Sequence, residues 1–134
     1  MNRPVRETPA TPAPNQARGG SIVSYPSRGP WGDANWRGNC SGYLYRDLFE
    51  LLRPKLFVDP MCGSGTSMEV AREMGIRAVG LDLHSGFDIC RESIRARLGE
   101  EADLCLSHPP YAGMIVYSGQ VWGDAPHPAA RFEP

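Results

Sequence analysis

The chain has almost no lysine and no long apolar stretch. Lys55 is the only lysine, so arginine carries nearly all of the positive charge. Arginine suits phosphates and base edges through its planar fork, but genome composition also produces arginine-rich chains, and the sequence leaves both explanations open. No apolar run approaches the ~18 residues of a membrane-spanning helix. The N-terminus has no hydrophobic signal-peptide core, so we expect a cytoplasmic protein with no membrane partner.

The four cysteines form no Cys-x-x-Cys pair. Cys40, Cys62, Cys90 and Cys105 are widely spaced, which argues against a zinc knuckle, and we expect no metal site. Three of the four lie in apolar stretches, so we expect small core residues in a reducing, intracellular setting. The net charge is -1, and the overall charge balance therefore does not by itself indicate a nucleic-acid binder.

The length of 134 residues allows one domain at most. Residues 1–30 are rich in proline and hold four arginines against one acid, Glu7, which predicts a disordered Pro/Arg-rich arm. This arm is either a solvated linker or a basic segment that follows a DNA backbone. We expect the folded domain in residues 31–124, where two tryptophans in a loop indicate packing, and an irregular tail in residues 125–134.

Hydrophobic spacing predicts alternating helices and strands. Leu44, Leu48, Leu51 and Leu52 recur at helical spacing, so a helix should begin after Ser41 or Asn39 and end before Pro54. The later elements are predicted as a strand at 56–59, a helix at 66–74 with Val70 and Met74 inward and Gly75 at its end, a strand at 77–83, a helix near 89–98 stopped by Gly99, and a strand at 102–107. This order is typical of an open parallel α/β sheet.

A glycine-rich turn joins the first predicted strand to the helix that follows it. Gly63 and Gly65 would let the backbone approach a ligand closely. Met68 stands where a dinucleotide fingerprint has its third glycine, and no lysine follows, which excludes a phosphate-binding P-loop. Asp59, at the end of the strand, suits a cationic or amine-bearing ligand better than a pyrophosphate.

The segment Asp59-Pro-Met-Cys-Gly-Ser-Gly-Thr66 resembles the first motif of S-adenosylmethionine-dependent DNA amino-methyltransferases. The resemblance implies that Asp59, Pro60, Gly63 and Gly65 line the cofactor and that Thr66 begins the helix. It also implies that Asp82, at the end of the second strand, binds the ribose hydroxyls, as an acid does at this place in Rossmann-like folds. Asp88 either caps the next helix or lies near the adenine ring.

His108-Pro-Pro-Tyr111 resembles the catalytic loop of the same family. Pro109 and Pro110 stiffen the loop. The resemblance implies that His108 and the Pro109 carbonyl accept hydrogen bonds from an exocyclic amine, while Tyr111 stacks on an extruded base. The family usually has Asp, Asn or Ser where His108 stands. A neutral imidazole has one acceptor nitrogen and a protonated one has none, so we expect activity to fall at low pH.

The resemblance implies a Rossmann-like methyltransferase fold, a three-layer αβα arrangement with a mostly parallel sheet. Tyr117 and Trp122 either contact the target base or pack within the fold. The family's sheet has seven strands, so residues 31–124 would form a partial catalytic domain, truncated after the catalytic strand. Three explanations remain: a truncated product, one piece of a split enzyme completed by a second chain, or a remnant. An incomplete sheet would leave an open edge.

The implied activity is methyl transfer from S-adenosylmethionine to the exocyclic amine of adenine or cytosine in DNA, as in restriction-modification. No cysteine follows a proline as in cytosine-ring methylases, so we expect direct transfer without a covalent enzyme intermediate. The alternative is a non-catalytic remnant or subunit that acts as an interaction protein. A third option is methylation of RNA or of a protein amide.

Overall fold

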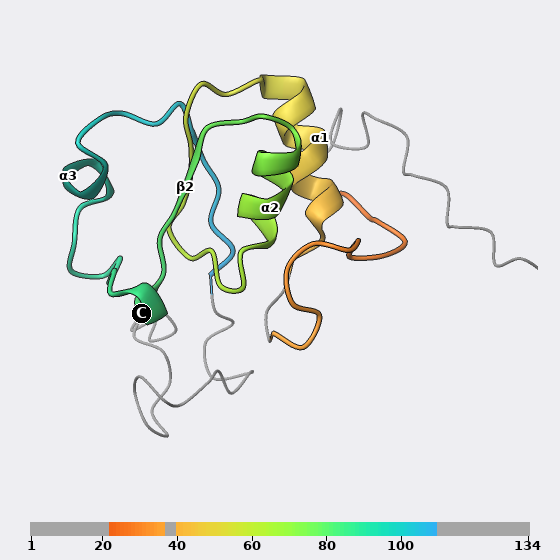
Figure 1. Cartoon of the computed structure of the whole chain (residues 1–134), viewed down its shortest axis with the longest axis horizontal. Coiled ribbons are helices and arrows are strands. Elements are labelled where there is room, and N and C mark those ends of the chain that lie inside the picture. The colour runs from red at the N-terminus through yellow and green to blue at the C-terminus, as the bar shows by residue number, and fades with distance from the viewer. Residues whose placement is uncertain (1–21, 37–39, 110–134) are drawn as a thin grey trace, which may run out of the picture.

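The computed structural model describes residues 22–36 and 40–109. Four features predicted from the sequence therefore lie outside the described residues: the arm up to residue 21, the site residues Pro110, Tyr111, Tyr117 and Trp122, the remainder of the domain to residue 124, and the tail 125–134. The described part is an α/β fold built on a small parallel sheet (Figure 1).

Three parallel strands form the sheet, with the first strand in its centre. The strands are β1 (Phe57–Asp59), β2 (Ala78–Gly80) and β3 (Leu104–Cys105), in the order β2-β1-β3. Val58 lies opposite Val79 on one side and opposite Cys105 on the other. All three residues of β1 are buried, as is typical of a central parallel strand with elements on both faces. Strands β2 and β3 are shorter than the predicted segments 77–83 and 102–107.

Helix α1 (Gly42–Leu52) begins and ends where the sequence predicted. The Ser41 hydroxyl accepts from the Tyr43 N–H at 3.3 Å, so Ser41 is the N-cap. Arg53 ends the helix in the left-handed region, with φ +46°, and its N–H donates to the Phe49 carbonyl. Pro54 follows and prevents continuation.

The predicted leucine face of α1 is wrong. Tyr45 and Phe49 are buried, whereas Leu51 and Leu52 are 40% and 52% exposed. Tyr45 and Phe49 are four residues apart and so share one face of the helix. The Phe49 ring meets the Phe57 ring of β1 with centroids 4.8 Å apart. Aromatic rings bury more apolar area than leucines and gain from edge contacts, so the aromatic stripe turns inward.

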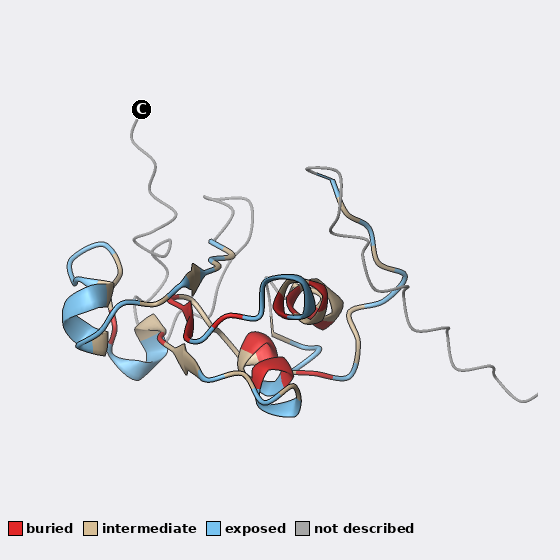
Figure 2. Ribbon diagram, turned by 90° about the horizontal axis from the view of Figure 1, so that it is seen from above, coloured by how far each residue is buried: buried red, intermediate tan, exposed pale blue. Residues whose placement is uncertain are grey.

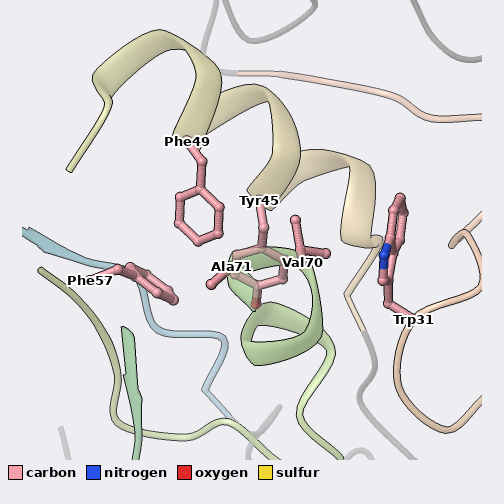
Figure 3. Packing of buried hydrophobic residues seen from close by; sticks show 6 residues of the cluster. All are labelled: Trp31, Tyr45, Phe49, Phe57, Val70 and Ala71. Carbon is pink, nitrogen blue, oxygen red and sulfur yellow. The ribbon is translucent and has the colours of Figure 1, made fainter. Parts of the chain in front are cut away.

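Helix α2 (Thr66–Glu73) packs beside α1 on the same face of the sheet. Figure 3 shows Tyr45 and Phe49 projecting from α1 towards Val70 and Ala71 of α2. Val70 and Ala71 are fully buried, and Met74 packs against this cluster at the helix end. Gly75 follows with φ +69°, a conformation that glycine adopts without strain. The predicted helix at 66–74 is therefore confirmed.

A smaller cluster covers the other face of the sheet. Val58, Leu81 and Phe87 are buried there, and Ile94 and Leu98 of α3 (Ile94–Leu98) pack against them. Because residues 57 and 58 point to opposite faces, helices cover both sides of the sheet, as expected for three layers. A short 3₁₀ helix, η1 (Leu83–Ser85), follows β2.

Helix α3 is shorter than the predicted segment 89–98. Its N-cap is Ser93, whose hydroxyl accepts from the Ala96 N–H at 3.2 Å. Asp88 does not cap this helix: its carboxylate accepts from the Cys90 N–H at 2.9 Å and caps a turn before it. The alternative place of Asp88, near the adenine ring, stays a prediction. Gly99 ends the helix with φ +71°, as predicted.

The cysteines are not core residues, contrary to expectation. Cys40 and Cys62 are half-buried, while Cys90 and Cys105 are exposed. Each lies in a loop or turn except Cys105, which lies on the edge strand β3, where one neighbour is missing among the described residues. Apolar flanking residues therefore did not place these thiols in the interior.

Contacts with the folded part begin within the segment assigned to the arm. The Tyr25 hydroxyl donates to Asp47 Oδ2 at 2.8 Å, and its ring stacks on Tyr43 with centroids 6.3 Å apart. The Gly42 N–H donates to the Arg28 carbonyl at 2.9 Å. Residues 25–30 therefore contact helix α1 before the chain reaches Trp31.

Candidate functional site

The carboxyl ends of the three strands meet at one edge of the sheet. From β1 the chain passes through α2 to β2 on one side, and later returns to β3 on the other side. In open α/β sheets, ligands bind in the crevice at such a switch point. At these ends lie Asp59, the last residue of β1, with Pro60 after it, then Leu81 and Asp82 after β2, and the segment 106–109 with His108 after β3.

Glycine gives the loop after β1 its shape. Gly63 and Gly65 have φ of +52° and +91°, which other residues rarely adopt. The Gly65 N–H donates to the Cys62 carbonyl at 2.8 Å, and the Gly65 carbonyl accepts from the Glu69 N–H, which begins helix α2. The loop is also tied to the neighbouring strand, because the Cys62 N–H donates to the Leu81 carbonyl at 3.0 Å.

Asp59 organises this loop from inside. Its side chain is 2% exposed, Oδ1 accepts from the Met61 N–H at 3.0 Å, and Oδ2 accepts from the Ser67 hydroxyl at 2.6 Å. Burial raises the pKa of Asp59 above its ordinary value, and the nearby Asp82 charge raises it further, while the Ser67 and Met61 hydrogen bonds oppose the shift. Both oxygens therefore hold the strand end, the turn and α2 together.

Asp82 faces the glycine loop from the end of β2. Its Oδ2 accepts from the Gly63 N–H at 3.0 Å, and its Oδ1 accepts from the His84 N–H at 3.0 Å. Ser85 completes a capping box with Asp82 at the start of η1. Asp82 is only half-buried, so its carboxylate can be reached by a ligand in the crevice.

Pro60 and Thr66 lie at the two ends of the loop, and Thr66 begins α2 as the resemblance implied. Pro60 is fully buried directly after β1. Thr66 is the first residue of α2, and its hydroxyl lies 3.5 Å from an Arg28 guanidinium nitrogen. The Arg28 guanidinium also donates to the carbonyls of Gly29 and Trp31, while its buried Nε finds no hydrogen-bond partner among residues 22–36 and 40–109.

A strap, residues Trp31–Trp36, crosses the loop and the start of α2. Its main chain donates from Gly32 to Glu69 at 2.8 Å and from Asp33 to the Ser64 hydroxyl at 3.1 Å. The Trp31 indole donates to Glu73 at 2.7 Å and enters the core. Two tryptophans in a loop correctly indicated packing.

Sequence reasoning did not identify the surface that Trp36 would meet. Its indole lies against Gly63 and meets the His84 ring. The tryptophan itself was the available signal, but the partner surface comes from residues distant in the chain.

The segment after β3 approaches the glycine loop. His108 lies close enough to Asp59 for its charge to lower the pKa of that carboxyl, against the dominant effect of burial. His108 is half-buried, and Pro109 is exposed. The structure therefore brings together Asp59, Asp82 and His108, three of the residues that the two motifs predicted.

The far side of the sheet differs in charge. Its arginines are paired with acids: Arg77 with Glu100, Arg91 with Asp88, Arg95 with Glu101, and Arg97 with Glu92. Asp88 belongs to this surface through Arg91, at 3.7 Å. These paired arginines leave little uncompensated positive charge for a nucleic-acid backbone around α3.

The described residues contain neither a metal-binding cluster nor a membrane-spanning helix. Within residues 22–36 and 40–109, no group of three or more His, Cys, Asp or Glu side chains could hold a metal ion. In that same part of the chain, no helix has both the length and the apolar character that crossing a membrane demands.

No protein-family model, no curated protein and no solved structure matches this chain. A functional assignment therefore depends on the residues themselves and on the geometry described above.

Proposed function

We propose that this chain is the cofactor-binding part of a Rossmann-like S-adenosylmethionine-dependent methyltransferase that acts on an exocyclic amine of adenine or cytosine in DNA. One observation carries the proposal: the two motifs meet. Asp59 ends the central strand β1, and His108 follows the adjacent parallel strand β3, where the Leu106 N–H donates to the Val58 carbonyl at 3.2 Å, one residue before Asp59. Such convergence at a topological switch point is expected of a binding crevice.

The residues present fit this cofactor. A Cβ at Gly63 would lie 2.8 Å from Trp36 Nε1, so only glycine lets the loop pass this closely beside the indole. Gly63 and Gly65 would hold the methionine part, and the half-buried Asp82 carboxylate would accept from the ribose hydroxyls. When bound, S-adenosylmethionine supplies a methyl group on a positively charged sulfur. Asp59 would hold the loop in place through its hydrogen bonds with Met61 and Ser67.

His108 and Pro109 would position the amine that receives the methyl group. Proline fixes φ at residue 109, and the proline that follows in the sequence restricts ψ, so the carbonyl of Pro109 has a narrow range of directions. The neutral His108 imidazole and this carbonyl would accept the two amine hydrogens, which turns the nitrogen lone pair towards the methyl group. A protonated His108 has no acceptor nitrogen, so transfer should be lost in acid. Tyr111 would stack on the extruded base, and Tyr117 and Trp122 would contact that base or pack within the fold. All three lie outside the described residues.

DNA would be the partner, through a base extruded from the duplex. Among the described residues, the paired arginines around α3 make that surface a poor candidate for backbone contact. The crevice edge near His108 is the better candidate, because the target amine must arrive there.

A second candidate function is an interaction subunit without catalysis. One observation favours it: β3 hydrogen-bonds to β1 through the Leu104 and Leu106 N–H groups, and its other edge has no strand beside it among the described residues. Such an edge can pair with another chain, which would complete the sheet of a split enzyme. This candidate predicts cofactor binding only after the second chain is added.

Transfer of a radiolabelled methyl group from S-adenosylmethionine to duplex DNA tests the proposal. We expect label in N6-methyladenine or N4-methylcytosine after digestion to nucleosides, and loss of label with Pro109→Ala while cofactor binding persists. Label on RNA or protein in a competition with DNA would reassign the substrate. No label on any of the three, with the folded chain and bound cofactor, would refute the catalytic proposal.

A further inference from the structure

Trp36 bridges the loop after β1 and the turn after β2. A Cβ built on Gly63 would come within 2.8 Å of Trp36 Nε1 and within 3.4 Å of two ring carbons. The indole also meets the His84 ring, with centroids 5.3 Å apart and planes at 75°. One aromatic side chain therefore touches both elements that would hold the two halves of the proposed cofactor.

The main chain holds Trp36 in this place. Its N–H donates to the Asp33 carbonyl at 3.1 Å, and the Asp33 N–H donates to the Ser64 hydroxyl of the glycine loop. Asp33 Oδ1 accepts from the Asn35 N–H at 2.8 Å and tightens the same turn. This turn therefore attaches the indole to the loop that it covers.

The geometry brings this ring near the sulfur position of the proposed cofactor. The sulfur joins the methionine half to the adenosine half. The groups that would hold these halves, the Gly63 backbone and the Asp82 carboxylate, are themselves joined by a 3.0 Å hydrogen bond. The junction of the two halves must therefore fall beside Gly63 and Asp82, where the indole lies. Tryptophan is the aromatic side chain that best attracts a cation to its face.

We propose that Trp36 is the specificity-determining residue of the cofactor site: its indole contacts the positively charged sulfur and makes the site prefer S-adenosylmethionine to the neutral thioether left after transfer. This inference rests on the proposed function. It names a residue outside both motifs, and it gives the site a means of releasing its product, because the attraction ends when the charge is lost.

Calorimetric titration of the full chain with S-adenosylmethionine and, separately, with S-adenosylhomocysteine tests this. Wild type, Trp36→Phe and Trp36→Leu are compared, and circular dichroism checks that each is folded. We expect Trp36→Leu to weaken S-adenosylmethionine about 2- to 30-fold and to leave S-adenosylhomocysteine unchanged. Trp36→Phe should retain part of the preference.

The outcomes separate the two proposals. Equal weakening of both ligands by Trp36→Leu would give Trp36 a packing role and would overturn the inference alone, as would no change in either. Wild type that binds neither ligand would overturn the proposed function together with the inference. If Trp36→Leu does not fold, Trp36→Phe decides, because the preference must still fall with the weaker aromatic ring.

Discussion

The two faces of the sheet are built in different ways. On the face of α1 and α2, six residues form a buried cluster, whereas three form the cluster on the face of α3. Figure 2 shows the same contrast, with buried residues gathered in α1 and α2 and with α3 largely exposed. The face of α3 carries ion pairs at its surface instead of a second large cluster. Exposed ion pairs contribute little to stability.

This difference shows where the fold is most firmly determined. Helix α2, the glycine loop and the strap are bonded to one another and to the larger core, so the half that would hold a cofactor is well defined. The segment bearing His108 instead follows β3, a two-residue edge strand. The following predictions test this contrast.

The largest effect should come from the larger core. Phe57→Ala removes a fully buried ring that contacts Tyr45 and Phe49, and we expect it to lower the free energy of unfolding by about 3–5 kcal/mol. Leu98→Ala, on the opposite face, removes a half-buried side chain and should cost clearly less. Urea unfolding followed by circular dichroism measures both. Equal costs would show that the two faces contribute alike.

The next effect concerns the carboxyl beneath the loop. Asp59→Ala leaves the buried Ser67 hydroxyl and the Met61 N–H without their acceptor, and should cost about 1–3 kcal/mol. Loss of cofactor binding in this variant would therefore not by itself identify a cofactor contact. Asp59→Asn is the matched control, because an amide can accept from Met61 and donate to the Ser67 oxygen.

The pH dependence of stability follows from the same group. Because burial raises the pKa of Asp59, the folded protein keeps this proton to a higher pH than the unfolded chain does. The contribution of Asp59 to the free energy of unfolding is fully present below its unfolded pKa, near 3.8, and is lost as pH rises through its folded pKa. Asp59→Asn should therefore gain stability relative to wild type between pH 4 and the folded pKa. A difference in unfolding free energy between Asp59→Asn and wild type that stays constant across that pH range would contradict the raised pKa of Asp59.

The smallest effect should come from the surface near β3. Asp103 accepts from the N–H groups of Lys55 and Leu56 at 2.9 and 2.8 Å, which lowers its pKa. The contribution of Asp103 to the free energy of unfolding is present above its unfolded pKa of 3.8 and is lost as pH falls through its folded pKa. Asp103→Asn should be slightly less stable than wild type at pH 7 and equal to it in acid. Thermal unfolding at the two pH values distinguishes this from an effect on packing.

Local patterns predicted the elements around the glycine loop well. The cap at Ser41, the stops at Gly75 and Gly99, and the inward Val70 each depend on nearby residues, and so the sequence alone indicated them. The alternation of predicted strands and helices likewise indicated a parallel sheet, which the structure has.

Other features depend on contacts between distant segments. The choice between leucine and aromatic faces of α1 was decided by the Phe57 ring. The strap joins Gly32 to Glu69 and Trp31 to Glu73. Hydrophobic periodicity along the sequence does not predict pairs that lie so far apart in the chain. Asp59 was expected to face a ligand, yet its two oxygens hold Met61 and Ser67, because a buried carboxylate at a strand end needs nearby donors.

Titration calorimetry with S-adenosylmethionine tests the central claim most directly. Asp82→Asn is compared with Asp103→Asn, a matched change before β3, at the opposite end of the strands. We expect saturable binding by wild type, an affinity about 10- to 100-fold lower in Asp82→Asn from the lost charged hydrogen bonds, and no change in Asp103→Asn. A folded wild-type chain that takes up no S-adenosylmethionine, or equal affinities in the two variants, would contradict the assignment of this loop as a cofactor site.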